Sequence, residues 1–182
     1  MKTALLIVDV QNDFCPGGAL PTPQGNIIIP VINKLLDKFD LIIASRDWHP
    51  EETIHFNHWP VHCVRGSHGA DFPADIKREK IIQIFEKGTG SKDDGYSAFE
   101  ATNKNLSEYL NEKEVDELYI AGLTAEYCVK STILDSLKHG FNTFVIKDAV
   151  EGLRQNEDDF DNAFEEMKNA GAIIITSDDI NG

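Results

Sequence analysis

Apolar residues along the chain form short continuous runs that alternate with stretches of helical periodicity. Six such runs have the length and composition of buried strands: residues 3–8, 41–44, 81–85, 118–121, 143–146 and 172–175. Apolar positions recur every three or four residues over about 27–39, 105–111, 128–139 and 157–170, which predicts helices. Strands separated by helices are typical of a parallel sheet covered on both faces. The sequence therefore predicts an α/β fold, a three-layer α/β/α arrangement around a six-stranded, mostly parallel, doubly wound sheet.

The chain is expected to form a single domain over residues 1–182. Its 182 residues and 41% hydrophobic content suffice for one core. Lys and Arg number 17 against 31 Asp and Glu, so the formal net charge is −14. Such a charge repels a phosphate backbone and an anionic membrane surface, so neither nucleic acid nor membrane is an expected partner. Association into a homo-oligomer is compatible with the sequence.

The cysteines indicate a reducing compartment. Cys15, Cys63 and Cys128 are odd in number and far apart, which does not suit a disulfide framework. The apolar run at the N-terminus is broken by Asp9 and has no cleavage site, so it predicts a first strand and not a signal peptide. We therefore expect a cytoplasmic location.

Cys128 follows the run at residues 118–121 and precedes a segment of helical periodicity. It is therefore expected in the first turn of a helix that starts just beyond the carboxyl end of a strand. Free backbone N–H groups and the positive end of the helix dipole favour a thiolate there. Open α/β sheets also bind their ligands at this edge. On this stretch alone, a buried cysteine that packs as a small hydrophobe is an equal alternative.

Asp9 and Lys87 end two other predicted strands at the same edge. A partly desolvated carboxylate at the end of residues 3–8 could serve as a general base. Taken singly, Asp9 could instead cap a loop, and Lys87 could be a solvated charge. An acid, a cation and a thiol at the ends of three different strands favour a site in which a base and a positive charge activate the sulfur of Cys128.

Histidine is concentrated in the long, aperiodic segment after the second predicted strand. Loops of this length in a compact domain are usually functional. Alternation along an extended backbone would point Asp47 and His49 to the same side. With His55 and His62 they offer one oxygen and three nitrogen donors, a set that suits Zn²⁺, Fe²⁺ or Mn²⁺.

Other readings of the histidine-rich segment stay open. His58 and His68 are alternative ligands, and Cys63, which adjoins His62, would favour zinc as a soft thiolate. The simplest alternative is a group of surface histidines with no metal.

Short motifs occur in a fixed order along nearly the whole chain. They are residues 6–14 (LIVDVQNDF), 45–50 (SRDWHP), His55, 59–64 (WPVHCV), Gly66, 69–72 (GADF), Lys87-Gly88 and 122–129 (GLTAEYCV). Each motif alone is modest, but the ordered set is highly specific. It resembles the nicotinamidase/pyrazinamidase branch of the isochorismatase-like cysteine hydrolases.

The resemblance implies one isochorismatase-like hydrolase domain and a set of site residues. It implies a catalytic triad of Asp9, Lys87 and Cys128, and an oxyanion hole made by the backbone N–H groups of Thr124 and Cys128 next to a cis Leu123–Thr124 peptide. It further implies metal ligation by Asp47, His49, His55 and His62. The ring-binding aromatic residues would be Phe14, Trp59 and Tyr96.

The same resemblance implies an amidohydrolase that acts on a carboxamide C–N bond. The expected reaction is hydrolysis of nicotinamide to nicotinate and ammonia through a cysteine thioester, as part of NAD salvage, with pyrazinamide as an accepted analogue. One divalent metal ion is expected, zinc first, with iron or manganese as alternatives. A sibling amidase that acts on another amide, such as an N-carbamoyl compound, and a non-catalytic metal-binding protein on the same fold are the competing hypotheses.

Overall fold

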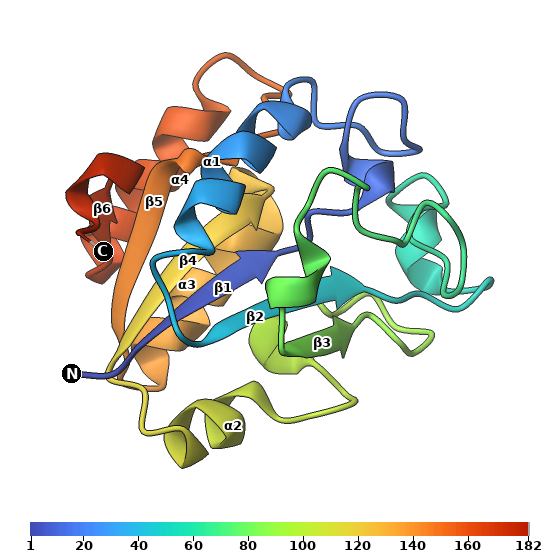
Figure 1. Ribbon diagram of the computed structural model, residues 1–182. Coiled ribbons are helices and arrows are strands. Elements are labelled where there is room, and N and C mark those ends of the chain that lie inside the picture. Colours follow the sequence, from blue (N-terminus) through green and yellow to red (C-terminus); the bar gives the residue numbers. More distant parts are fainter. Residues whose placement is uncertain (182) are drawn as a thin grey trace.

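A six-stranded parallel sheet forms the centre of the protein, in a computed structural model that describes residues 1–181. The strands are β1 (Thr3–Val8), β2 (Ile42–Asp47), β3 (Gln83–Lys87), β4 (Glu117–Leu123), β5 (Asn142–Glu151) and β6 (Ile173–Ile175). Their order is β3-β2-β1-β4-β5-β6, and every neighbouring pair is parallel (Figure 1). The predicted α/β fold and sheet are confirmed.

Helices cover both faces of this sheet. They are α1 (Ile29–Leu35), α2 (Leu106–Glu112), α3 (Lys130–Lys138) and α4 (Asp159–Ala170). Figure 1 shows α1 in front of the sheet and α3 behind it. Along β1, Leu5 and Ile7 pack into the core on the α1 side, whereas Leu6 and Val8 pack into the core on the α3 side. Both faces of the strand are thus buried, which explains its unbroken apolar run.

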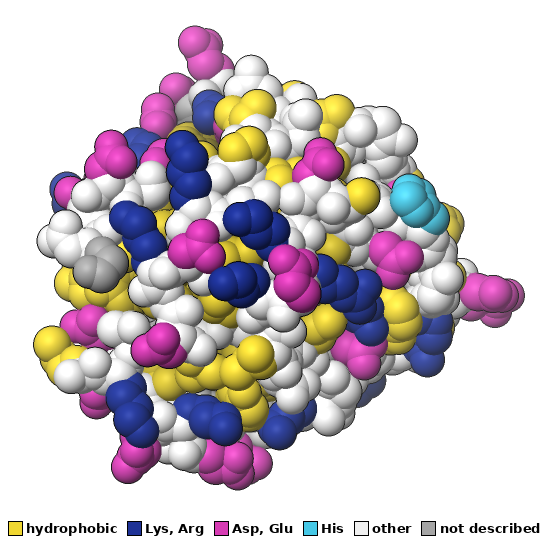
Figure 2. Space-filling model, viewed as in Figure 1, with side chains coloured by type: hydrophobic (Ala, Val, Ile, Leu, Met, Phe, Trp, Pro, Cys, Tyr) yellow, Lys and Arg dark blue, Asp and Glu magenta, His cyan; other side chains and the backbone are white. Residues whose placement is uncertain are grey.

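None of the helices among residues 1–181 is long and apolar enough to cross a membrane. On the face drawn in Figure 2, Lys and Arg side chains lie interspersed with Asp and Glu. Opposite charges that alternate in this way give no extended area of one sign on that face.

Several strands run beyond their predicted ends. β2 continues to Asp47 and β5 to Glu151, although their apolar runs stop earlier. In β2 the polar residues are held by the ladder with β3, in which Asp47 is paired with Lys87. A prediction from apolar runs stops at the first polar residue. It therefore misses the polar end of a strand, which is where the residues of the site lie.

Two predicted helices need correction. The first, expected over about 27–39, is a 3₁₀ turn over Gly25–Ile28 followed by α1, which has Pro30 in its first turn and ends at Leu35. The last begins at Asp159 and not at about 157, with Asp158 at its N-cap and no side-chain cap. The Asn156 backbone N–H donates to the Asp159 carboxylate (2.8 Å).

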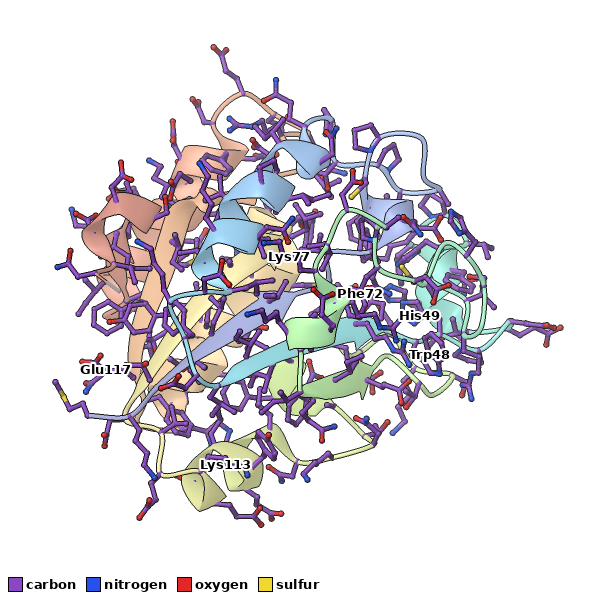
Figure 3. All side chains as sticks on the ribbon, viewed as in Figure 1. Trp48, His49, Phe72, Lys77, Lys113 and Glu117 are labelled. Atoms are coloured by element: carbon purple, nitrogen blue, oxygen red, sulfur yellow. The ribbon has the colours of Figure 1, made fainter. Side chains whose placement is uncertain are left out.

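The topology places a crevice at the carboxyl ends of β1 and β4. The chain runs from β1 outward through β2 to β3, then returns to place β4 on the other side of β1. Ligands bind where the strand order reverses in this way. Figure 3 shows His49 beyond the carboxyl end of β2, while Glu117 lies at the opposite end of the sheet. The long segment after β2 thus lies at the crevice edge.

Gly122 lets β4 approach β1 at this crevice. Its φ is +125°, and an added Cβ would lie 2.1 Å from the Val8 carbonyl oxygen. Gly140 also has a positive φ (+86°), but space around its missing Cβ is open.

We expect Gly122→Ala to lower the free energy of unfolding by more than about 4 kcal/mol, because two backbones would be forced apart. Gly140→Ala should cost only about 1–2 kcal/mol, the strain of a left-handed residue. Urea denaturation of both variants measures the difference. Equal losses would contradict a close approach of β1 and β4.

Candidate active site

Lys87 lies at the centre of the site, fully buried at the end of β3. Its ammonium nitrogen is 2.7 Å from Asp9 Oδ2, 2.6 Å from Asp47 Oδ1 and 3.4 Å from Cys128 Sγ. It also donates to the Gly95 carbonyl oxygen (2.7 Å). Burial alone would lower the pKa of this amine, but the Asp47 and Asp9 carboxylates raise it well above its usual value. The side chain is therefore a permanent cation.

Asp9 follows β1 in a left-handed conformation (φ +50°) and is fully buried. Its Oδ1 accepts a hydrogen bond from the Ser45 hydroxyl (2.8 Å). Its Oδ2 faces Lys87 as an ion-pair partner but accepts no well-directed hydrogen bond. Burial raises the pKa of this carboxyl, and Lys87 only partly opposes that shift. Asp9 thus has a free lone pair and a raised basicity, the two properties of a general base.

Cys128 lies in a π-helical turn, Ala125–Val129, that precedes α3. This is close to the predicted first helical turn. Burial raises the pKa of the thiol well above 9.0. The Lys87 ammonium acts to lower this pKa, and the negative charges of Asp9 and Asp47 act to raise it further. Cys128 therefore keeps its proton at neutral pH. Desolvation and two nearby carboxylates thus act against the helix dipole, which favours a thiolate.

The charges of this buried cluster constrain where the thiol proton can go. One ammonium and two carboxylates leave a single net negative charge. Loss of the thiol proton to solvent would add a second uncompensated charge, which is costly in a buried site. Transfer of the proton from Cys128 to Asp9 leaves the total unchanged. Oxygen and sulfur atoms of Asp9, Asp47 and Cys128 lie within 4.8 Å of one another, but the Lys87 ammonium contacts all three, so they are not a metal site.

Three buried imidazoles form a second cluster beside the first. The ring nitrogens of His49, His55 and His62 that could serve as ligands lie within 4.8 Å of one another. In each ring Nδ1 is close to an oxygen that can only accept, which fixes the proton on Nδ1 and leaves Nε2 as a ligand atom. The three acceptors are Gly88 O (2.8 Å from His49), Asp93 Oδ1 (2.7 Å from His55) and Pro60 O (2.6 Å from His62).

Asp47 joins the two clusters. Its Oδ1 contacts Lys87, while its Oδ2 lies 3.4 Å from His49 Nε2 and 3.7 Å from His62 Nε2. Burial acts to raise the pKa of this carboxyl, but Lys87 and the two nearby histidines hold it well below its ordinary value. The Gln11 side chain fixes Asp47 by accepting from its backbone N–H (2.9 Å) and donating to its carbonyl (2.8 Å).

These residues fit a divalent metal ion. His49 Nε2 is buried and has no hydrogen-bond partner, which is unusual unless another group completes its environment. Burial lowers the pKa of His55, so this imidazole is neutral, as a ligand must be. A carboxylate and three imidazoles suit zinc, iron or manganese.

The alternative ligands lie outside this cluster. The His58 side chain is 65% exposed and its Nε2 is 3.6 Å from Asp93 Oδ2. His68 is exposed as well. The Cys63 thiol contacts the Gly69 carbonyl (4.0 Å), and burial raises its pKa well above the ordinary value. The structure therefore brings together Asp47, His49, His55 and His62 and leaves the three alternatives apart.

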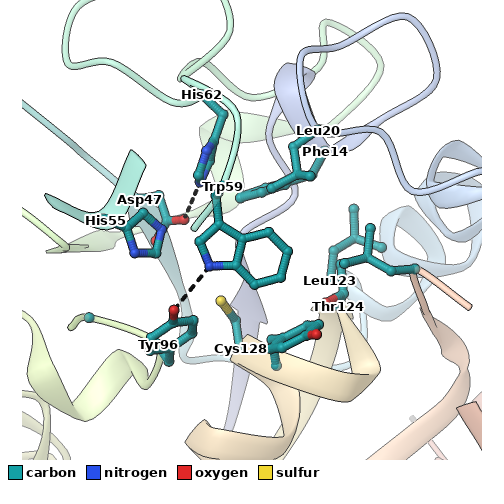
Figure 4. A pocket seen from close by; sticks show the side chains of 13 residues that line it. Phe14, Leu20, Asp47, His55, Trp59, His62, Tyr96, Leu123, Thr124 and Cys128 are labelled. Carbon is teal, nitrogen blue, oxygen red and sulfur yellow. Dashed lines mark hydrogen bonds and ion pairs between the residues drawn. The ribbon is translucent and has the colours of Figure 1, made fainter. Parts of the chain in front are cut away.

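A pocket opens above Cys128 between the two clusters (Figure 4). The predicted aromatic residues Phe14, Trp59 and Tyr96 all line it. The Trp59 indole N–H donates to the Tyr96 hydroxyl (3.0 Å), and burial raises the pKa of Tyr96 to about 12. Thr124 also lines the pocket, and the Leu123–Thr124 peptide bond is cis, as the resemblance implied.

Sequence reasoning missed further residues of this pocket. The additional lining side chains are Leu20, Leu123, Tyr127 and Leu153. Tyr127 makes an edge-to-face contact with Trp59, with ring centroids 4.9 Å apart. Its position next to Cys128 is a usable signal, whereas Leu20 and Leu153 come from loops whose paths the sequence does not reveal.

Comparison with known proteins identifies the fold family. The sequence pattern of the isochorismatase domain matches residues 3–179. The chain belongs to the isochorismatase family. The resemblance inferred from the ordered motifs is thereby confirmed.

Named members of this family are similar over most of their length. A nicotinamidase of Escherichia coli (strain K12) is 38% identical over 95% of this chain and 94% of its own. The crystal structure of a pyrazinamidase of Pyrococcus horikoshii in complex with zinc is 43% identical, with a TM-score of 0.87 over 97% of this chain and 99% of that one. The L. infantum protein PnC1 in complex with nicotinate is 30% identical, with a TM-score of 0.90 over 97% and 93% of the two chains.

Gly88 tests the geometry of the histidine cluster. Its φ is +63°, and an added Cβ would lie 2.5 Å from His49 Cε1. Gly88→Ala should displace the His49 ring and weaken affinity for divalent metal by about 10–100-fold, as the loss of a supporting contact does in other metal sites. Gly90→Ala, two residues on with open space around it, should leave affinity unchanged. Chelator competition measures both. Unchanged affinity in Gly88→Ala would contradict a ligand role for His49.

Proposed function

We propose that this chain is a nicotinamidase, which hydrolyses nicotinamide to nicotinate and ammonia through a thioester on Cys128. The observation that carries the proposal is a pocket that places a buried Cys128–Asp9–Lys87 cluster on one side and four metal-binding side chains on the other. The activities named for the E. coli and P. horikoshii relatives support it. In this reading the chain acts in NAD salvage.

The first step forms the thioester. Asp9 takes the Cys128 proton as the sulfur attacks the carboxamide carbon, so the buried cluster keeps its net charge. Lys87 stays protonated and stabilises the developing negative charge. The backbone N–H groups of Thr124 and Cys128 would hold the oxyanion, and loss of one such donor typically costs about 10²–10³ in rate. Asp9 then returns the proton to the leaving nitrogen, and ammonia departs.

The second step cleaves the thioester with water. Asp9 accepts a proton from the water as its oxygen attacks the acyl carbon, and the same proton passes to the departing sulfur. The product forms as nicotinic acid and leaves as nicotinate once its carboxyl proton passes to solvent, and Cys128 and Asp9 return to their starting protonation states. One carboxylate therefore serves as base and acid in turn, which the raised pKa of Asp9 favours.

We further propose that Asp47, His49, His55 and His62 hold a divalent metal ion. Zinc is the first candidate, in keeping with the P. horikoshii structure, and iron or manganese are alternatives. When bound, the ion would bind the pyridine nitrogen and orient the ring relative to Cys128. Phe14, Trp59 and Tyr96 would enclose the ring. Pyrazinamide keeps a ring nitrogen at the same distance from its carboxamide and is expected to be accepted as well.

Ammonia release from nicotinamide by the purified, metal-loaded chain tests the proposal. The wild-type protein should release ammonia, and Cys128→Ala should not. Activity in both proteins would mean that Cys128 is not the nucleophile. A wild-type protein that is inactive on nicotinamide with metal bound would overturn the proposal in favour of an amidase for another amide.

Asp9 should set the pH dependence of Cys128 reactivity. Because burial raises the pKa of Asp9 above 3.8, the rate of Cys128 alkylation should fall as pH drops through that raised pKa and the carboxyl becomes protonated. Asp9→Asn should lose this acid limb. Its rate should instead rise about tenfold per pH unit towards the high pKa of the thiol, and at pH 7 it should be about 10²–10⁴ below wild type.

Mass spectrometry of the iodoacetamide-labelled peptides measures this profile. Cys15 provides an internal control, since burial raises its pKa to about 11. Coincident profiles for the wild-type and Asp9→Asn proteins would exclude Asp9 as the base.

A further inference from the structure

Asp93 contacts the histidine cluster from outside. It lies on the loop after β3, and its side chain is 30% exposed. Its Oδ1 is 2.7 Å from His55 Nδ1 and also accepts a hydrogen bond from the Tyr96 hydroxyl (2.9 Å). One carboxylate oxygen therefore holds both a metal-binding imidazole and a wall of the pocket.

The hydrogen bonds continue from Tyr96 to Trp59. The Tyr96 oxygen donates its proton to Asp93 and accepts the Trp59 indole N–H (3.0 Å), the bond drawn in Figure 4. Each group in this series of hydrogen bonds has its donor and acceptor roles fixed by its neighbour. An uninterrupted path of three hydrogen bonds thus links His55 to the indole that closes the pocket.

His55 differs from the other two imidazoles in the kind of acceptor it uses. His49 and His62 are oriented by the backbone carbonyls of Gly88 and Pro60. Only His55, among the three, is oriented by a side chain that carries a charge and can be replaced. An anionic acceptor strengthens a hydrogen bond to an imidazole N–H, and the bond gains further when the opposite ring nitrogen binds a cation.

We infer that Asp93 is a positioning residue that couples metal binding to closure of the aromatic pocket. It orients His55 towards the metal ion and, through Tyr96, holds Trp59 against the ring-binding space. By linkage, a bound metal orders the wall that Trp59 forms, before substrate arrives. This inference rests on the metal site of the proposed function and adds the residue by which that site acts on the pocket.

The chain contains a matched control for Asp93. Asp94 is the next residue, has the same charge and is exposed, and it makes no hydrogen bond or ion pair within residues 1–181. Replacement of either aspartate changes the net charge equally. A difference between the two variants therefore reports the contacts of Asp93 and not the overall field.

Zinc affinity of the apoprotein, measured by competition with a chromogenic chelator, tests the first half of the inference. Asp93→Ala should weaken zinc binding by about 10–100-fold, whereas Asp94→Ala should bind within about twofold of wild type. Asp93→Asn keeps a neutral acceptor and should fall between Asp93→Ala and wild type. Equal affinities of Asp93→Ala and Asp94→Ala would overturn the positioning role.

Tryptophan emission tests the second half. The chain contains two tryptophans, so Trp59 is the only one left in a Trp48→Phe background. Zinc should reduce acrylamide quenching of its emission in this background. Adding Tyr96→Phe, which removes the bridging hydroxyl, should abolish that protection while zinc affinity stays within about threefold. Protection that survives Tyr96→Phe would overturn the coupling. Should the Trp48→Phe background not fold, the change in total emission on zinc addition, with and without Tyr96→Phe, decides the same point.

These measurements separate the inference from the function on which it rests. A wild-type chain that releases ammonia from nicotinamide and binds zinc, beside an Asp93→Ala variant of equal zinc affinity, overturns the inference alone. A wild-type chain that binds no divalent metal overturns the metal site and the inference together.

Discussion

The buried ammonium of Lys87 is the interaction on which the site depends. Two carboxylates, Asp9 and Asp47, lie within 2.7 Å of it, and all three side chains are removed from water. Loss of one partner from such a group typically costs about 3–5 kcal/mol, because a buried charge is left uncompensated. The sheet itself supplies the geometry, since the parallel register of β2 and β3 places Asp47 beside Lys87.

The site consists of two side-chain clusters that share one residue, Asp47. In the proposed reaction Asp9 and Cys128 exchange a proton next to the Lys87 cation, so charge moves within the cluster without entering or leaving it. The second carboxylate oxygen of Asp47 faces the imidazoles. A change at Asp47 would therefore disturb both sides at once, which makes it less informative as a single substitution than Asp9 or Asp93.

Much of this could be predicted from the sequence, and the reason is topological. Carboxyl ends of parallel strands meet at one edge, so an acid, a cation and a cysteine that end different strands must converge there. The local density of histidine indicated the second cluster in the same way. The roles of Asp93 and Gln11 were missed because they depend on the path of loops and not on periodicity. The helix dipole favours a thiolate at Cys128, but burial of the sulfur beside Asp9 and Asp47 raises the pKa of the thiol, and the sequence does not reveal how deeply this side chain is buried.

The central claim is that Cys128 becomes acylated during turnover while Asp9 holds its proton. Rapid acid quench of the enzyme with excess nicotinamide, followed by mass spectrometry of the peptide that contains Cys128, tests it most directly. The account predicts a nicotinoyl adduct on Cys128 that appears within the first turnover and disappears as substrate is consumed. Ammonia release with no adduct on Cys128 at any quench time, under conditions in which a synthetic nicotinoyl thioester survives the quench, would contradict it.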